Sequence, residues 1–136
     1  MTSFKIVLDS NEYVFYLADK NRDILKLLNL EVKIFLNNVI FKEVVRNIRK
    51  ESVKQLIELL KNPKFAVNTD KISDALIEKY GNLGLKKGDI IIAAFCESVN
   101  ASFLISENRH FLKDVKFDKF KVVELSEFLA AGRKHS

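Results

Sequence analysis

The sequence contains a single cysteine, Cys96, so it cannot form an internal disulfide bond. This cysteine lies in the apolar run Ile90–Cys96, and we expect it to be a small core residue. Cysteine and histidine also form no cluster with the spacing of a zinc site. The absence of a disulfide framework favours a cytoplasmic location.

Long hydrophobic runs are missing as well. No apolar stretch approaches the roughly 20 residues that span a bilayer, and residues 4–8 are too short for a signal-peptide core. We therefore expect no membrane association. The chain has no repeat, linker or low-complexity segment, and its 136 residues, 48% of them hydrophobic, predict a single domain over residues 1–136.

Acidic residues are outnumbered by basic ones, 18 against 23, which gives a net charge of +5. Such an excess is compatible with a polyanionic partner, through long-range attraction and counterion release. It identifies no partner by itself, because many basic proteins bind no nucleic acid. What matters is whether the basic residues surround an acidic pocket.

Five short apolar segments have the composition of buried strands: 4–8, 32–36, 64–67, 101–105 and 121–125. Helical patterns separate or follow them: 12–30 with a break near 19–23, a helix capped by Asn38, 51–63 stopped by Pro63, 68–81 ending at Gly81, 90–100, and 126–134. This alternation predicts an α/β fold with a central, mostly parallel sheet of four to five strands.

Polar residues follow two of these strands. Right-handed crossovers place the carboxyl ends of parallel strands at one edge, where open α/β sheets bind ligands. Asp9 follows the first strand, and Glu107 and Asn108 follow the fourth. Glu43 lies early in the helix after the second strand, and Asp89 opens the apolar helix 90–100. We expect these side chains to converge.

Each of these residues also has an ordinary structural explanation at a turn, a helix end or a surface. The alternatives are an Asx turn between Asp9 and Asn11, a surface pairing of Glu43 with Arg46 or Asn47, an N-cap or first-turn position for Asp89, a turn role for Asn108 and a solvated Glu107. As a set, however, carboxylates gathered at one edge repel one another unless cations lie between them. Oxygen ligands of this kind suit Mg²⁺ or Mn²⁺.

Four pieces of the sequence, "IVLDSN", "FKEVVRNI", "KKGDIIIAA" and "FLISENRHF", resemble in their order the motifs of PIN-domain ribonucleases, including VapC-like toxins of toxin–antitoxin pairs. The resemblance covers nearly the whole chain. It implies a three-layer α/β/α sandwich and a Mg²⁺- or Mn²⁺-dependent endoribonuclease. Such an enzyme hydrolyses RNA phosphodiester bonds and leaves 5′-phosphate and 3′-hydroxyl ends.

The same resemblance implies the site residues. Asp9, Glu43, Asp89 and Asn108 take the catalytic positions, and the first three would be metal ligands. Many members carry Asp where this chain has Asn108, and a neutral amide would bind a second cation less strongly. Glu107 or Asp114 are the residues that would compensate. Ser10, Ser106 and Glu107 are possible accessory residues. The two serine hydroxyls would bond the carboxylates or a phosphate, and local turn capping is the alternative for both.

The hypothesis is in-line attack of water on a backbone phosphate, with the cation lowering the pKa of that water. Asp9 and Asp89 would be the shared ligands, Glu43 a direct or water-mediated one, and Asn108 would orient a water. Four basic residues are candidates to bind the RNA backbone: Lys86, Lys87, Arg46 and Arg109. A solvated basic surface is the alternative for each of them.

Three rival functions compete with the nuclease. The first is a catalytically weak or inactive PIN-like domain that binds RNA or protein, which the neutral Asn108 keeps open. A receiver-like domain would need adjacent acids after the first strand, and a haloacid-dehalogenase-like phosphatase would need Asp-x-Asp there; "DSN" provides neither. The resemblance also implies a small antitoxin partner and a homodimer, for which the segment 12–30 is a candidate surface.

Overall fold

A computed structural model describes residues 3–134 of the chain. Its five strands are β1 (Phe4–Leu8), β2 (Val32–Leu36), β3 (Phe65–Val67), β4 (Phe103–Ile105) and β5 (Lys121–Val123). They form one sheet in the order β3-β2-β1-β4-β5, and each neighbouring pair is parallel. The predicted α/β class is confirmed, with five strands and an all-parallel sheet.

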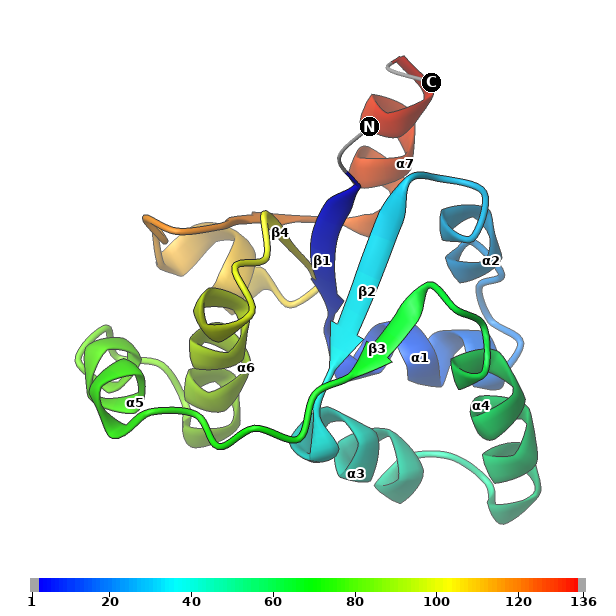
Figure 1. Cartoon of the computed structure of the whole chain (residues 1–136), viewed down its shortest axis with the longest axis horizontal. Coiled ribbons are helices and arrows are strands. Elements are labelled where there is room, and N and C mark those ends of the chain that lie inside the picture. The colour runs from blue at the N-terminus through cyan, green and yellow to red at the C-terminus, as the bar shows by residue number, and fades with distance from the viewer. Residues whose placement is uncertain (1–2, 135–136) are drawn as a thin grey trace.

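Helices cover both faces of this sheet, so the domain has three layers (Figure 1). The helices are α1 (Ser10–Leu17), α2 (Ile24–Leu27), α3 (Asn38–Arg46), α4 (Val53–Leu60), α5 (Asp74–Gly81), α6 (Lys87–Ser98) and α7 (Leu125–Lys134), with short helical turns η1 (Lys50–Ser52) and η2 (His110–Asp114). In Figure 1, α5 and α6 lie on one side of the sheet and α1, α2 and α4 on the other.

Two helix starts differ from the sequence prediction, and capping hydrogen bonds explain both. Asn38 is the first residue of α3 rather than its cap, because the Asn37 side chain accepts a hydrogen bond from the Ile40 N–H at 2.9 Å. Helix α5 begins six residues later than residue 68, since Ser73 caps it by accepting from the Leu76 N–H at 3.2 Å.

Other predicted segments differ at their ends. Helix α6 begins at Lys87, so Asp89 lies inside its first turn instead of opening it. The predicted helix 12–30 divides into α1 and α2 at the expected break. Strand β5 stops before Leu125, because that residue already begins α7. The π-helical turn η2 has no counterpart in the prediction.

The core is one cluster formed by the strands and by the inner faces of the helices on both sides of the sheet. Ile6, Val7 and Leu8 of β1 are completely buried, as expected for the central strand of a sheet covered on both faces. Cys96 is buried and unpaired on α6, which confirms its assignment to the core. Among the described residues, none of the helices has the length and apolar character needed to cross a membrane.

Two completely buried tyrosines differ in how their hydroxyl groups are satisfied. The Tyr80 hydroxyl donates a hydrogen bond to Glu97 Oε1 at 2.7 Å. The Tyr13 hydroxyl has no hydrogen-bond partner within residues 3–134. Since a buried unsatisfied hydroxyl carries a desolvation cost, the two groups should have opposite effects on stability.

We therefore expect Tyr13→Phe to raise the free energy of unfolding by about 1 kcal/mol, because it removes an unsatisfied polar atom. Tyr80→Phe should lower it by about 1.5–3 kcal/mol, because a hydrogen bond to a carboxylate is lost. Urea unfolding of the two variants beside the wild type measures both. Equal destabilisation by the two changes would contradict this account of Tyr13.

Candidate functional site

The register of β1 and β4 brings Asp9 and Ser106 together at the carboxyl edge of the sheet. Leu8 pairs with Ile105, and the Asp9 N–H donates to the Ile105 carbonyl at 2.9 Å. One residue further along, Ser106 Oγ donates to Asp9 Oδ2 at 2.8 Å. Asp9 Oδ1 accepts from the Ser10 N–H, also at 2.8 Å. Two predicted site residues, 97 positions apart in sequence, are thus directly bonded.

Buried polar residues are confined to this part of the molecule. The described part of the chain buries five polar or charged residues, all within four positions after β1, β2 or β4: Asp9, Ser10, Glu12, Asn37 and Ser106. Burying polar groups costs free energy unless they are paired, so such a concentration needs a reason. Asn37 is explained by its capping bond to α3, whereas the carboxyl groups are not explained by capping alone.

Asp9 lies in the field of two further acids. Burial raises the pKa of the Asp9 carboxyl, the hydrogen bonds from Ser106 and Ser10 oppose that rise, and the charges of Asp89 and Glu107 add to it. The side chains of Asp89 and Glu107 therefore lie near enough to Asp9 to interact with it. This brings together three of the predicted site and accessory residues, from β1, β4 and α6.

Asp89 is half-buried in the first turn of α6. Burial raises the pKa of its carboxyl, and the neighbouring His110 and Lys86 lower it. A buried acid at a helix N-terminus is also favoured by the helix dipole. Asp89 is thus influenced by two basic neighbours, and its own charge acts on Asp9.

Glu12, on the first turn of α1, is a functional candidate that the sequence reasoning missed. It is only 5% exposed, and its Oε1 has no hydrogen-bond partner among the described residues. Burial, followed by the hydrogen bond and charge of Glu107 and the charges of Asp9 and Glu124, raises the pKa of Glu12 to about 9. The available signal was an acid three positions after Asp9, in "DSNE". We call Asp9, Glu12, Asp89 and Glu107 the acidic cluster.

Glu43 makes its contacts within its own neighbourhood on α3. Its Oε2 accepts from Arg46 Nη1 at 3.0 Å and its Oε1 from Asn47 Nδ2 at 3.3 Å, with 45% of the side chain exposed. This is the surface pairing that was the alternative to a metal role. A role for Glu43 as a ligand stays a prediction.

Asn108 organises the turn after β4. Its N–H donates to Ser106 Oγ at 3.0 Å, and its side-chain Oδ1 accepts from the His110 N–H at 3.0 Å, just where η2 begins. These bonds correspond to the predicted turn alternative. They also connect Asn108 to Asp9 through the hydroxyl of Ser106.

Glu107 is exposed beside Asn108, and its Oε1 accepts from the Leu125 N–H at the start of α7 at 3.3 Å. The side chain of Asp114, the other residue expected to compensate for Asn108, lies outside the described residues. All four predicted RNA-binding residues are exposed: Lys86, Lys87, Arg46 and Arg109. Lys86 and Arg109 lie within three residues of Asp89 and of Asn108, respectively.

The donors at this edge suit a hard divalent cation, since they are carboxylate oxygens and one of them, Glu12 Oε1, is buried without a partner. Within residues 3–134, no three His, Cys, Asp or Glu side chains are placed to hold a metal ion by themselves. Mg²⁺ commonly binds through one or two carboxylates, completing its shell with water and substrate phosphates. The residues present fit that mode of binding.

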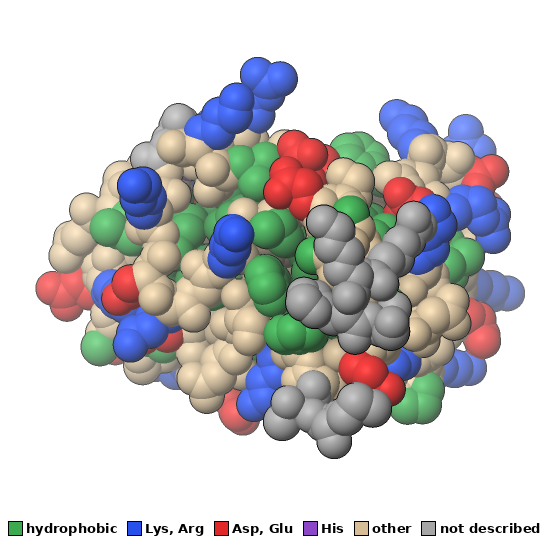
Figure 2. Space-filling view, turned by 90° about the horizontal axis from the view of Figure 1, so that it is seen from above, with side chains coloured by type: hydrophobic (Ala, Val, Ile, Leu, Met, Phe, Trp, Pro, Cys, Tyr) green, Lys and Arg blue, Asp and Glu red, His purple; other side chains and the backbone are tan. Residues whose placement is uncertain are grey.

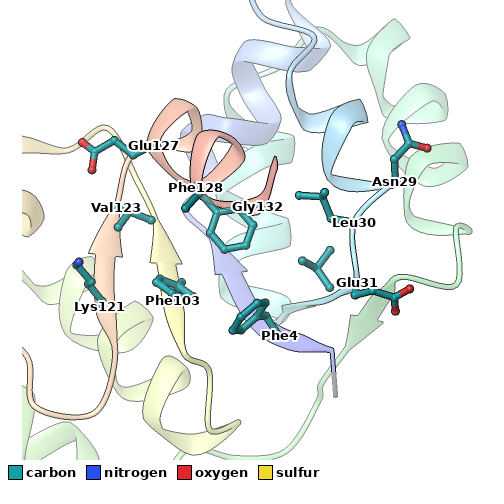
Figure 3. A pocket seen from close by; sticks show the side chains of 12 residues that line it. Phe4, Asn29, Leu30, Glu31, Phe103, Lys121, Val123, Glu127, Phe128 and Gly132 are labelled. Carbon is teal, nitrogen blue, oxygen red and sulfur yellow. The ribbon is translucent and has the colours of Figure 1, made fainter. Parts of the chain in front are cut away.

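A hollow of about 620 Å³ lies elsewhere, at the amino-terminal part of the sheet. It lies between α7 and the loop before β2, and the rings of Phe4, Phe103 and Phe128 contribute much of its lining (Figure 3). Figure 2, viewed from above Figure 1, shows basic, acidic and hydrophobic side chains interspersed on the amino-terminal face. None of the predicted site residues lines this predominantly apolar pocket, so the candidate site is the acidic edge.

The chain is an α/β domain with an all-parallel open sheet and buried carboxyl groups at its carboxyl edge, the edge where such sheets bind ligands. The family model described as "PIN domain" matches residues 6–118, a range that includes the whole acidic cluster. The chain belongs to the PIN-domain family. No curated protein matches it significantly.

Among solved structures, the fold is similar to a chain in the crystal structure of VapBC2 from Rickettsia felis bound to a DNA fragment from their promoter. The TM-score is 0.66 at 16% sequence identity, and the match covers 89% of this chain and 98% of the other. At this identity the similarity concerns the fold. It agrees with the three layers and the five-stranded parallel sheet described above.

The raised pKa of Glu12 predicts how stability depends on pH. The folded protein holds a proton on this carboxyl up to about pH 9, whereas the unfolded chain releases it near 4.5. The folded state therefore binds more protons between these values, and its stability should fall as the pH rises through that window. Urea unfolding in EDTA across this range measures the slope. The Glu12→Gln variant should show a smaller slope, and an unchanged slope would contradict the assignment.

Proposed function

We propose that the chain is a Mg²⁺- or Mn²⁺-dependent endoribonuclease that hydrolyses phosphodiester bonds in RNA. The observation that carries the proposal is the buried Asp9 carboxylate, held by Ser106 and surrounded by Asp89, Glu107 and Glu12. Family membership supports it, since the four resembling motifs fall at this edge or in the helix after β2.

In the proposed reaction, the protein positions charge and leaves nucleophilic attack to water. The hydrogen bonds of Ser106 and Ser10 fix both oxygens of Asp9, so that its lone pairs face a defined direction. Asp89 supplies a second oxygen donor from α6. A bound divalent cation supplies the positive charge that lowers the pKa of a water and stabilises the phosphate oxygens.

Four exposed basic residues neutralise the phosphates of RNA bound at this edge: Lys86, Lys87, Arg46 and Arg109. Asn108 holds the turn that carries Glu107 and orients a water beside the phosphate. The proposed products have 5′-phosphate and 3′-hydroxyl ends, as in the nucleases that the motifs resemble.

We also propose that the enzyme is the toxin of a toxin–antitoxin pair, with a small antitoxin protein as its partner. Its similarity to a chain of VapBC2 supports this part, as does the resemblance to VapC-like toxins. A homodimer and a cytoplasmic location remain predictions from the resemblance and from the cysteine content.

A second candidate is an inactive PIN-like domain that binds RNA or protein. It is favoured by the contacts of Asn108 and Glu43, both of which satisfy local groups. This function requires no cation. It predicts that the thermal unfolding temperature does not change with Mn²⁺.

Replacing Asp9 or Asp89 by Asn should reduce RNA cleavage in Mg²⁺ by more than about 100-fold. This exceeds the loss that is typical when a residue hydrogen-bonded to a metal ligand is replaced. The amide preserves size, so circular dichroism spectra should remain those of the folded protein. Cleavage of end-labelled RNA measures the rate, and EDTA should stop the wild-type reaction.

Glu127→Gln serves as the matched control, because this exposed acid belongs to the apolar pocket. It should cleave at the wild-type rate. Wild-type cleavage by Asp89→Asn would refute the site assignment, and continued cleavage in EDTA would refute the cation mechanism. A wild-type protein with neither RNA cleavage nor a Mn²⁺-dependent rise in unfolding temperature would favour the binding module.

A substitution at Glu43 distinguishes a role as a metal ligand from a role in a surface ion pair. If it holds the cation, Glu43→Gln should lower cleavage by at least about tenfold at fixed Mg²⁺, with partial recovery at higher Mg²⁺. Asn47→Ala removes the two hydrogen bonds that the Asn47 amide donates to the Glu43 carbonyl and Oε1, keeps the Glu43 carboxylate, and should leave the rate unchanged. Equal rates for Glu43→Gln and the wild type would remove Glu43 from the site.

A further inference from the structure

Glu12 occupies a position where an acid ordinarily has a capping role. Asp9 is the N-cap of α1 and Glu12 its third residue, which is the spacing of a capping box. In that motif the glutamate side chain accepts from the backbone N–H of the N-cap residue. Here the Asp9 N–H already donates to the Ile105 carbonyl of β4, at 2.9 Å. Sheet pairing therefore removes the usual capping role of Glu12.

The carboxyl group of Glu12 instead interacts with Glu107. The two residues follow the neighbouring strands β1 and β4, whose carboxyl ends lie side by side. Glu12 is only 5% exposed, and its Oε1 lacks a hydrogen-bond partner within the described residues. Glu107 is exposed and so borders solvent. Two carboxyl groups in contact repel when both are ionised, unless a cation neutralises them.

The fourth motif lacks the charge that this pair would provide. Asn108 is neutral, and its Oδ1 is occupied by the His110 N–H. Glu107, one position earlier, has a carboxyl group whose charge acts on Glu12 and Asp9 and whose Oε1 also accepts from the Leu125 N–H. A hard cation bound through one or two carboxylates and water needs such a pair, with one oxygen anchored in the protein and one reached from solvent.

We propose that Glu12 and Glu107 form a carboxylate pair that ligates the divalent cation beside Asp9, supplying the charge that Asn108 lacks. The inference rests on the proposed function for its cation. It adds two ligands to the site, and it is tested by binding alone.

The experiment measures Mn²⁺ binding by isothermal titration calorimetry at fixed pH, with the full chain and without RNA. Glu12→Gln and Glu107→Gln keep the side-chain shape and remove the charge. Each should weaken Mn²⁺ binding by at least about tenfold, which is the smallest effect typical of losing a residue that hydrogen-bonds to a metal ligand. Because Glu107 is exposed, its variant should fold even if a change at Glu12 disturbs packing.

Glu124→Gln is the matched control. Glu124 also acts on Glu12 through its charge, more weakly than Glu107 and Asp9 do. Its replacement should change Mn²⁺ affinity by less than about threefold, as a long-range charge effect screened by salt. The unfolding temperature with and without Mn²⁺, measured on all four proteins, gives a second readout: the cation should stabilise the wild type and Glu124→Gln most.

Wild-type affinity in both Glu12→Gln and Glu107→Gln would overturn the inference, and so would an equal loss in Glu124→Gln, which would indicate a general field effect. RNA cleavage by the wild type, measured separately, distinguishes failure of the carboxylate pair from failure of the proposed nuclease function. If the two Gln variants bind Mn²⁺ about tenfold more weakly and the wild type does not cleave RNA, the result supports the pair and contradicts the nuclease. Cleavage with unchanged Mn²⁺ affinity in both Gln variants supports the nuclease and contradicts the pair.

Discussion

The hydrogen bond between Ser106 Oγ and Asp9 Oδ2 is the interaction on which the site depends. It exists because β1 and β4 are parallel neighbours in a fixed register, which places the first residue after each strand side by side. Both residues are buried, so the bond is shielded from water, and losing either partner would leave an unsatisfied polar group. Ser106 Oγ also accepts from the Asn108 N–H, which extends the same network into the turn that carries Glu107.

The distribution of charge is as important as its total. The chain has a net charge of +5, yet the Asp, Glu, Lys, Arg and His side chains that residues 3–134 bury are the acids Asp9 and Glu12, while the predicted RNA-binding residues are exposed. Burial raises the pKa of both acids, and the charges of neighbouring acids raise it further: Asp89 and Glu107 act on Asp9, and Glu107, Asp9 and Glu124 act on Glu12. An acidic interior beneath a basic surface can attract a polyanion at long range and hold cations where the backbone arrives. A uniformly basic surface would provide only the first effect.

Much of this arrangement could be predicted from the sequence, and the rest could not for identifiable reasons. Short apolar runs alternating with helical patterns gave the parallel sheet, and the strand ends then placed Asp9 and Ser106 at one edge. The orientation of Glu43 was not accessible, because a side chain on a helix can face the site or a neighbour such as Arg46 at the same spacing. Glu12 was missed because an acid in a first helical turn is expected on dipole and capping grounds. Only the β1–β4 register reveals that its capping role is already taken.

Asn108 is a neutral residue at a position where the resemblance in sequence leads one to expect an acid. Its Oδ1 accepts the His110 N–H, a bond that an aspartate oxygen in the same place would also accept. The exchange of Asp for Asn therefore changes the charge of the edge and preserves the geometry of the turn. That turn sets the position of Glu107, whose charge acts on both Asp9 and Glu12. In the proposed site, the amide shapes the loop and the adjacent glutamate carries the charge, so that two roles that one aspartate could combine are divided between neighbouring residues.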